Sequence, residues 1–120
     1  MPPFSPITVV ETDEFLSATR KLMDDEERAG LVKYLAFNPT AGDVIPGSGG
    51  VRKIRWGLEG RGKHNGARVI YFFHDMEMPL LLLKAYAKNK QEDLSQIELK
   101  KMQQFTKQMV EEYRRRRQAL

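Results

Sequence analysis

The sequence predicts an α+β fold in which a small antiparallel sheet packs against an N-terminal α-hairpin and a C-terminal helix. Between Gly47 and Asn89, segments rich in β-branched and aromatic residues alternate with turn residues, a pattern typical of an antiparallel three-stranded meander. On both sides of this stretch, apolar residues recur at helical spacing. A chain of 120 residues can bury one hydrophobic core but not two, so residues 1–120 are expected to form a single domain.

The N-terminal part is expected to form an arm, a short strand and a first helix. Three prolines within residues 1–6 disfavour regular structure and indicate an irregular arm. Ile7 to Val10 is apolar and β-branched, which predicts a short strand that joins the meander in the antiparallel sheet. A helix can start at Thr12 or Asp13, because the apolar residues that follow have helical spacing.

A second helix is expected to start after Asp24, which can act as the N-cap while Glu27, three residues on, completes a capping box. This helix ends at Asn38, since the residue before a proline avoids the α region. The two helices form an α-hairpin, and the meander offers it the one large surface on which to bury its apolar stripe. The stripe of the second helix is expected to contain Leu31, Tyr34 and Leu35.

The remaining elements are a loop and a last helix. Residues 40–50 are rich in Gly and Pro and are expected to be a loop that crosses the sheet edge. Ser95 and Glu98 have the spacing of a capping box, so a helix should start there and run to about Arg116. Residues 114–120 form a basic tail. The core residues of this helix are expected to be Met102, Phe105 and Met109.

The composition excludes several classes of protein. Apolar residues make up 41% of the chain and charged residues 30%, as in an ordinary soluble globular protein. With no cysteine and two histidines, neither a thiolate site nor a histidine-rich metal cage is available, so we expect no metal and no cofactor. No apolar run approaches the roughly 20 residues of a membrane span, and we expect a cytoplasmic protein with no membrane partner.

Positive charge is concentrated in the middle of the chain. The whole protein has a formal charge of +4, whereas the stretch from Gly47 to Lys90 has nine Lys or Arg residues against three acids. This concentration of charge indicates a polyanionic partner. The nine cations are Arg52, Lys53, Arg55, Arg61, Lys63, Arg68, Lys84, Lys88 and Lys90.

Strand alternation predicts how some of these cations are oriented. Lys53 and Arg55 should share one face of their strand, with Ile54 and Trp56 on the other.

On the last strand of the meander, Lys84 and Tyr86 should share a face, which Lys88 joins if the strand continues. Arg68, expected near the start of its own strand, can reach the same side. One face or edge of the sheet could then gather cations from separate strands beside a tyrosine, which is an arrangement suited to a phosphate group.

Each of these signals also has an ordinary structural interpretation. Lys and Arg on an antiparallel sheet are commonly its solvated face, and Tyr86 can be a half-buried strand tyrosine. His64 and His74 can be merely exposed, although imidazole is the usual acid or base near neutral pH. A tyrosine phenol titrates at about 10, so proton transfer at neutral pH needs help from nearby cations. The arginines Arg114–Arg117 can be a solvated tail that favours nucleic acid weakly.

Taken together, the order of elements and the residues in them resemble the RelE superfamily of bacterial type II toxins, most closely its HigB-type branch. The resemblance extends from Ile7 onward and leaves out the first residues and the arginine tail. The stretches that carry it are Asn38-Pro39, Gly42–Ile45, Gly47, Gly49–Arg55, Gly60–Lys63, Gly66–Phe73, Tyr86–Lys90 and Asp93-Leu94.

The resemblance implies an endoribonuclease that enters the ribosomal A site and cuts messenger RNA during translation. It also implies a cognate helix-turn-helix antitoxin, and contact with operator DNA only through the toxin–antitoxin complex. On this basis Lys53, Arg55, Arg68 and Lys88 are expected to be catalytic. Residues expected to bind RNA are Arg52, Arg61, Lys63, His64, Lys84, Asn89 and Lys90.

The chain departs from RelE itself at two positions. Asn89 stands where RelE has a further arginine, and the stretch around Leu94 and Ser95 has no tyrosine to match the catalytic one of RelE. Tyr86 is the candidate replacement.

Metal-independent RNA cleavage uses the 2′-hydroxyl as nucleophile and leaves a 2′,3′-cyclic phosphate and a free 5′-hydroxyl. The protein has to move two protons and stabilise charge on the phosphoryl oxygens, for which Arg and Lys are suited. A lysine with a pKa lowered by neighbouring cations is a candidate base, and Tyr86 a candidate acid. Two other functions stay open, namely a non-enzymatic toxin of the ParE type that inhibits DNA gyrase, and a plain RNA-binding module.

Overall fold

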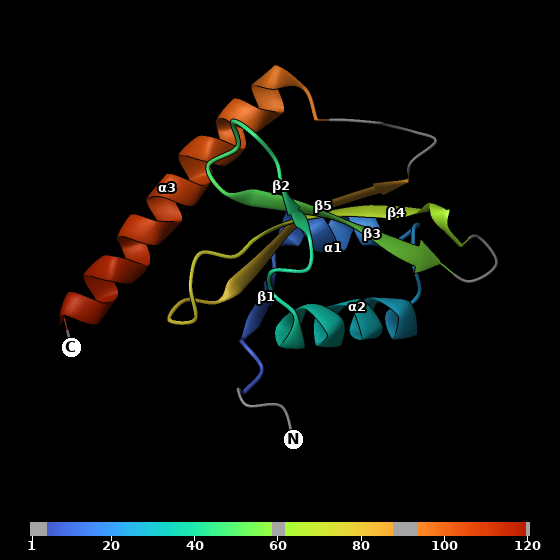
Figure 1. The fold of residues 1–120 in the computed structure, drawn as a ribbon, viewed down its shortest axis with the longest axis horizontal. Coiled ribbons are helices and arrows are strands. Elements are labelled where there is room, and N and C mark those ends of the chain that lie inside the picture. Colours follow the sequence, from blue (N-terminus) through green and yellow to red (C-terminus); the bar gives the residue numbers. More distant parts are fainter. Residues whose placement is uncertain (1–4, 59–61, 88–93, 120) are drawn as a thin grey trace.

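The computed structural model describes residues 5–58, 62–87 and 94–119 of the 120-residue chain. The described part contains a five-stranded sheet and three helices (Figure 1). In chain order the elements are β1 (Val9–Glu11), α1 (Asp13–Thr19), α2 (Asp25–Phe37), β2 (Asp43–Val44), β3 (Val51–Leu58), β4 (Gly62–Phe72), β5 (Leu80–Ala87) and α3 (Gln96–Ala119). The predicted α+β class, the α-hairpin, the meander and the last helix are confirmed.

The sheet has the strand order β1-β5-β4-β3-β2. The meander β3–β4–β5 is antiparallel, as predicted, but β1 pairs with β5 in parallel, so the sheet is mixed and not wholly antiparallel. The expected loop over residues 40–50 also contains β2, which pairs with the start of β3. The parallel pair joins segments about 70 residues apart, which a local sequence pattern does not specify. Strand β2 has only two residues, too few for alternation to predict a strand.

The helix ends follow from local chemistry. The Thr12 hydroxyl accepts a hydrogen bond from the Phe15 amide at 3.2 Å and donates to the Leu82 carbonyl at 2.7 Å, which ties the start of α1 to β5. Asp24 and Glu27 form the predicted capping box at the start of α2, with hydrogen bonds of 2.7 and 2.9 Å. These caps explain why the two helices begin where the sequence predicts.

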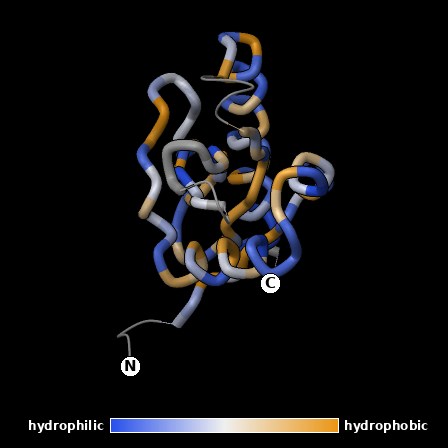
Figure 2. The backbone as a smooth tube through the Cα atoms, turned by 90° about the vertical axis from the view of Figure 1, so that its right-hand side faces the viewer, coloured by the Kyte–Doolittle hydropathy of each residue, from blue (hydrophilic) through white to orange (hydrophobic). Residues whose placement is uncertain are grey.

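Two apolar clusters cover the two faces of the sheet. The first packs α1 and α2 against one face, with Phe15, Leu31 and Leu35 fully buried. The second packs α3 against the other face through Met102, Met109, Val110 and Tyr113. In Figure 1, α3 lies to the left of the sheet, and β3 and β4 extend away from it to the right. Figure 2 shows hydrophobic segments in the centre of the molecule and others at its periphery.

Some expectations about the helices were wrong. Tyr34 is 42% exposed and Phe105 is 37% exposed, so neither is a core residue. On the same stripes, Leu31 and Leu35 are buried, and Met102 and Met109 are partly buried. Helical spacing identifies the buried side of a helix, but these two side chains project beyond the surface that covers it. Helix α3 continues past Arg116 to Ala119, so the arginine run Arg114–Arg117 is helical. Within the described ranges, no helix combines the length and apolar character needed to cross a bilayer.

Candidate functional site

Three of the predicted residues form one row across the sheet. The strand register pairs Arg55 of β3 with Arg68 of β4, and Arg68 with Tyr86 of β5. Residues paired in this way project from the same face, with Cβ atoms about 4.5–5.5 Å apart. Tyr86 packs in the cluster beneath α3, so the row lies on the α3 side of the sheet. Arg68 is central in this row and lies in the middle of β4, not at its start as expected.

A second row of predicted residues lies beside the first. Lys53 pairs with Ile70, and Ile70 pairs with Lys84. The register between β4 and β5 shifts after Ile70 and skips Leu83, which makes a β-bulge. In a regular strand, Lys84 would lie on the same face as Leu82, two residues before it, which packs toward α1 and α2. The bulge therefore brings Lys84 and Tyr86 to the same side as the cations of β3 and β4.

The environment of Arg68 is unusual for a guanidinium group. The side chain is buried, with the residue only 5% exposed, and its Nη1 has no hydrogen-bond partner within the described parts of the chain. A buried donor without a partner costs about 1–3 kcal/mol, and more when it is charged. Arg55 directly opposite adds like-charge repulsion. An anion bound to this row would relieve both costs.

Two predicted RNA-binding residues have other contacts. Arg52 pairs with Tyr71 on the face toward α1 and α2, where its Nη1 donates to the carbonyls of Gly42 at 2.7 Å and Thr40 at 3.3 Å. Arg52 thus braces the loop before β2 and is on the opposite face from Lys53. This placement argues against the expected RNA contact.

Lys84 forms an ion pair with Glu98 in the first turn of α3. Two hydrogen bonds lower the pKa of Glu98 below its usual 4.5. The larger effect comes from the bond donated by Lys84, and the smaller from the bond donated by the Ser95 amide. The same carboxylate completes the predicted capping box with Ser95. Lys84 therefore anchors the start of α3 on β5 in addition to lying beside the Arg68 row.

Several predicted site residues cannot be placed. Arg61, Lys88, Asn89 and Lys90 lie outside the described residues. Lys63 and His64 belong to β4, but the description there covers only their backbone.

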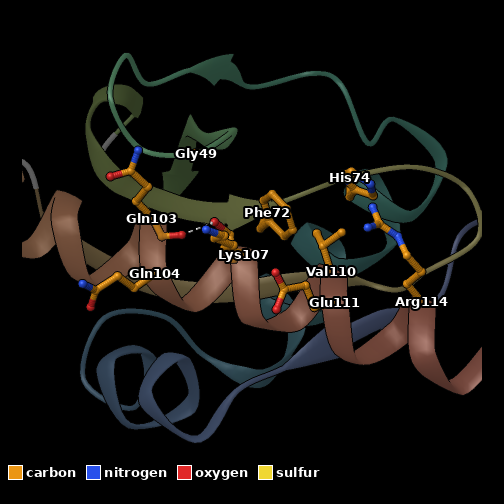
Figure 3. Close-up of a pocket in the computed structure, with 10 residues that line it drawn as sticks. Gly49, Phe72, His74, Gln103, Gln104, Lys107, Val110, Glu111 and Arg114 are labelled. Atoms are coloured by element: carbon orange, nitrogen blue, oxygen red, sulfur yellow. Dashed lines mark hydrogen bonds between the residues drawn. The ribbon is translucent and has the colours of Figure 1, made fainter.

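His74 lies away from the Arg68 row. It lines a separate groove of about 610 Å³ between the end of β4 and α3, and its ring stacks on Phe72 with centroids 6.1 Å apart. His74 and Arg114 lie side by side at one end of this groove (Figure 3). Arg68 and Phe72 are four residues apart on β4, which corresponds to roughly 13 Å along a strand. His74 is therefore too remote to share a phosphate with Arg68.

The sequence interpretation missed a surface groove on the other side of β3. Tyr34 and Trp56 form an aromatic pair at the edge of the sheet, with ring centroids 5.6 Å apart, and Asp43 of β2 lies opposite Lys53 in the register. The available signal was the single tryptophan of the chain, next to Arg55. Among the described residues, no cluster of three or more His, Asp or Glu side chains could hold a metal ion.

One comparison with known proteins bears on this site. The family model described as the RelE toxin of the RelE/RelB toxin–antitoxin system matches residues 11–120. The match includes every strand of the meander and α3, and so all the elements that position the Arg68 row.

Proposed function

Because the chain belongs to the RelE toxin family, whose members act with a cognate antitoxin, we propose that it is an endoribonuclease that cuts messenger RNA on the ribosome. Cleavage of translated messages in the cytoplasm would stop protein synthesis and growth. An antitoxin of the helix-turn-helix type neutralises the toxin, and the complex of the two binds operator DNA.

The Arg68 row is the observation that carries this proposal. A buried guanidinium with an unpaired Nη1, directly opposite a second arginine, costs stability unless an anion binds. A phosphodiester offers two non-bridging oxygens, which guanidinium groups can grip in a bidentate manner. Charge grows on these oxygens in the transition state, so donors held in place by a sheet accelerate the reaction.

The reaction at this row is an attack of the 2′-oxygen on the adjacent phosphorus. A P–O2′ bond forms, the P–O5′ bond breaks, a base takes the 2′-hydroxyl proton, and an acid protonates the leaving 5′-oxygen. Arg68 and Arg55 stabilise the phosphoryl oxygens. The phenol of Tyr86, paired with Arg68 in the register, is the candidate acid for the leaving oxygen, and Lys53 in the next row is the candidate base.

Two substitutions separate the charge of Lys53 from its capacity to accept a proton. Lys53→Arg keeps a cation but cannot serve as a base, whereas Lys53→Ala removes both properties. A base role predicts that both variants lose activity. A purely electrostatic role predicts that Lys53→Arg stays active.

The residues that cannot be placed stay part of the proposal as RNA contacts. Lys88 is proposed to act beside the row as a catalytic cation. The proposed contacts along the RNA strand are Arg61, Lys63, His64, Asn89 and Lys90.

Induced expression in a bacterial host tests the proposal. The wild-type chain should arrest growth with fast loss of translated messages, and Arg68→Met should abolish this loss. Arg20→Met is a matched control, because it removes one exposed arginine from the end of α1, on the other side of the sheet. Intact messages with gyrase-linked DNA breaks would favour a ParE-type toxin. If messages stay intact and the chain only binds RNA, the result would favour a plain RNA-binding module.

A further inference from the structure

A groove of about 570 Å³ lies at the β2 end of the sheet, where β3 is nearly an edge strand. Strand β2 pairs with Arg52 and Lys53, and the described residues provide no strand neighbour for the edge of β3 beyond them. The groove is lined by Tyr34 of α2, by Asp43 of β2, and by Lys53, Arg55 and Trp56 of β3.

The aromatic pair is the main feature of this groove. The rings of Tyr34 and Trp56 are 5.6 Å apart and inclined at 45°, and Tyr34 is 42% exposed. Trp56 is half-buried, with one edge near Gly30 of α2, where an added Cβ would lie 3.7 Å from the indole. The α2 helix therefore supports the indole from behind, while the tyrosine is accessible to a ligand.

We infer that this groove is a base-stacking subsite for the RNA strand whose phosphate is held by the Arg68 row. The inference rests on the proposed function for the identity of that strand. Every nucleobase has a π-face, and stacking on a protein aromatic ring is independent of sequence to a first approximation. A pair of rings beside cations is therefore suited to single-stranded RNA.

Arg55 connects the subsite to the phosphate row. It lines the groove, and it also pairs with Arg68 across the β3–β4 register. Arg55 is exposed, so its guanidinium can contact a phosphate located between the two sites. Asp43 is the acid among the lining residues, against the two cations Lys53 and Arg55. The local balance of charge is therefore positive, which favours a polyanion over an acceptor for a basic peptide.

The chain offers a direct optical probe of this subsite, since Trp56 is its one tryptophan. A short single-stranded RNA with 2′-O-methyl groups cannot be cleaved by 2′-oxygen attack, so its binding can be titrated through the emission of Trp56. We expect saturable quenching by this RNA. Tyr34→Leu, which removes the ring but keeps apolar bulk, should weaken binding about tenfold or more.

Matched variants separate stacking from general effects on the fold. Tyr34→Phe keeps the ring and should bind RNA as the wild type does. Phe105→Ala removes an aromatic residue of similar exposure, 37%, from α3 and should also leave binding unchanged. Circular dichroism of each variant checks that the fold is retained. If Tyr34→Leu fails to fold, the presence or absence of quenching of wild-type Trp56 by the RNA still tests the inference.

Several outcomes would overturn the inference. Absence of quenching, or equal affinity of Tyr34→Leu and the wild type, would show that no base stacks in the groove. Quenching by poly-glutamate but not by RNA would assign the groove to an acidic protein partner at the open edge of β3. Arg68-dependent cleavage without Trp56 quenching would refute the subsite alone. Tyr34-dependent quenching without cleavage would refute the proposed nuclease but keep the subsite.

Discussion

At the scale of the residue, the anion site proposed at Arg68 should lower the stability of the protein when no anion is bound. The buried Nη1 of Arg68 lacks a partner among the described residues, and Arg55 lies opposite. Arg68→Met keeps an unbranched side chain of similar reach. It removes the unpaired buried donor and also the repulsion between the two arginines. We expect the variant to raise the free energy of unfolding in urea by about 1 kcal/mol. A variant that is less stable than the wild type would contradict this explanation of the row.

The same site predicts an effect of anions. Sulfate at matched ionic strength should raise the melting temperature of the wild type more than chloride does, because a ligand that binds the folded state stabilises it. Arg68→Met should lose this difference, whereas Arg20→Met should retain it.

Tyr71 is a second residue whose role depends on burial. Its hydroxyl donates to the Pro39 carbonyl at 2.9 Å and accepts from the Gly42 amide at 2.7 Å, so it holds the loop before β2 against the sheet. A Cβ at Gly42 would lie 2.8 Å from the tyrosine ring, so that loop position has no room for a side chain. Tyr71→Phe leaves both backbone groups without this partner and should cost about 1–3 kcal/mol in urea denaturation.

The titration of the Tyr71 hydroxyl should make the stability of the protein depend on pH in the alkaline range. Burial raises the pKa of Tyr71 above its usual 10.0, against the lowering effect of the Gly42 hydrogen bond. Its contribution to stability should be complete below pH 10.0 and decline as the pH rises through the raised pKa. This alkaline loss should be smaller in Tyr71→Phe. Tyr34→Phe, at an exposed tyrosine, is the control for the urea measurement.

At the scale of the element, the start of α3 is tied to β5 by one carboxylate. Glu98 accepts hydrogen bonds from the Ser95 amide and from Lys84, and its pKa is lowered. A lowered pKa means that the contribution to stability is present above the usual 4.5 and is lost as the pH falls through the pKa of the folded state. Thermal unfolding between neutral and acidic pH should show this loss.

Glu98→Gln should be less stable than the wild type near neutral pH and should approach it in acid. Glu111→Gln, on the same helix, provides a control for the loss of one negative charge. Equal pH profiles for the wild type and Glu98→Gln would show that the ion pair does not hold α3.

The elements differ in how far the sequence predicts them. The capping boxes at Asp24 and Ser95 are local, since each needs two side chains three residues apart, and both occur as predicted. The partner of β1 is about 70 residues away in the chain, and the bulge at Leu83 depends on the pairing of β4 with β5. Periodicity describes local patterns only, so the parallel pair was not predicted. Strand β2 was missed for another reason, because two residues are too few to show an alternating pattern.

At the scale of the whole molecule, alternation along the strands correctly separated Lys53 and Arg55 from Ile54 and Trp56. The register between strands then brought Arg55, Arg68 and Tyr86 into one row, which alternation alone does not determine. The groove beside Trp56 was missed because it needs α2 and β3 to meet at the sheet edge. Charge along the chain thus predicts a cationic surface, and the strand register determines which of the cations lie together.

The central claim is that the Arg68 row stabilises the phosphate at which a message is cut. Its most direct test is a cleavage assay on ribosomes programmed with a defined message, with the ends of the products identified. We expect the wild-type protein to leave a 2′,3′-cyclic phosphate and a 5′-hydroxyl, and Arg68→Met to cut at least about a hundredfold more slowly. A message left intact by the wild type, or cut equally fast by Arg68→Met, would contradict the claim.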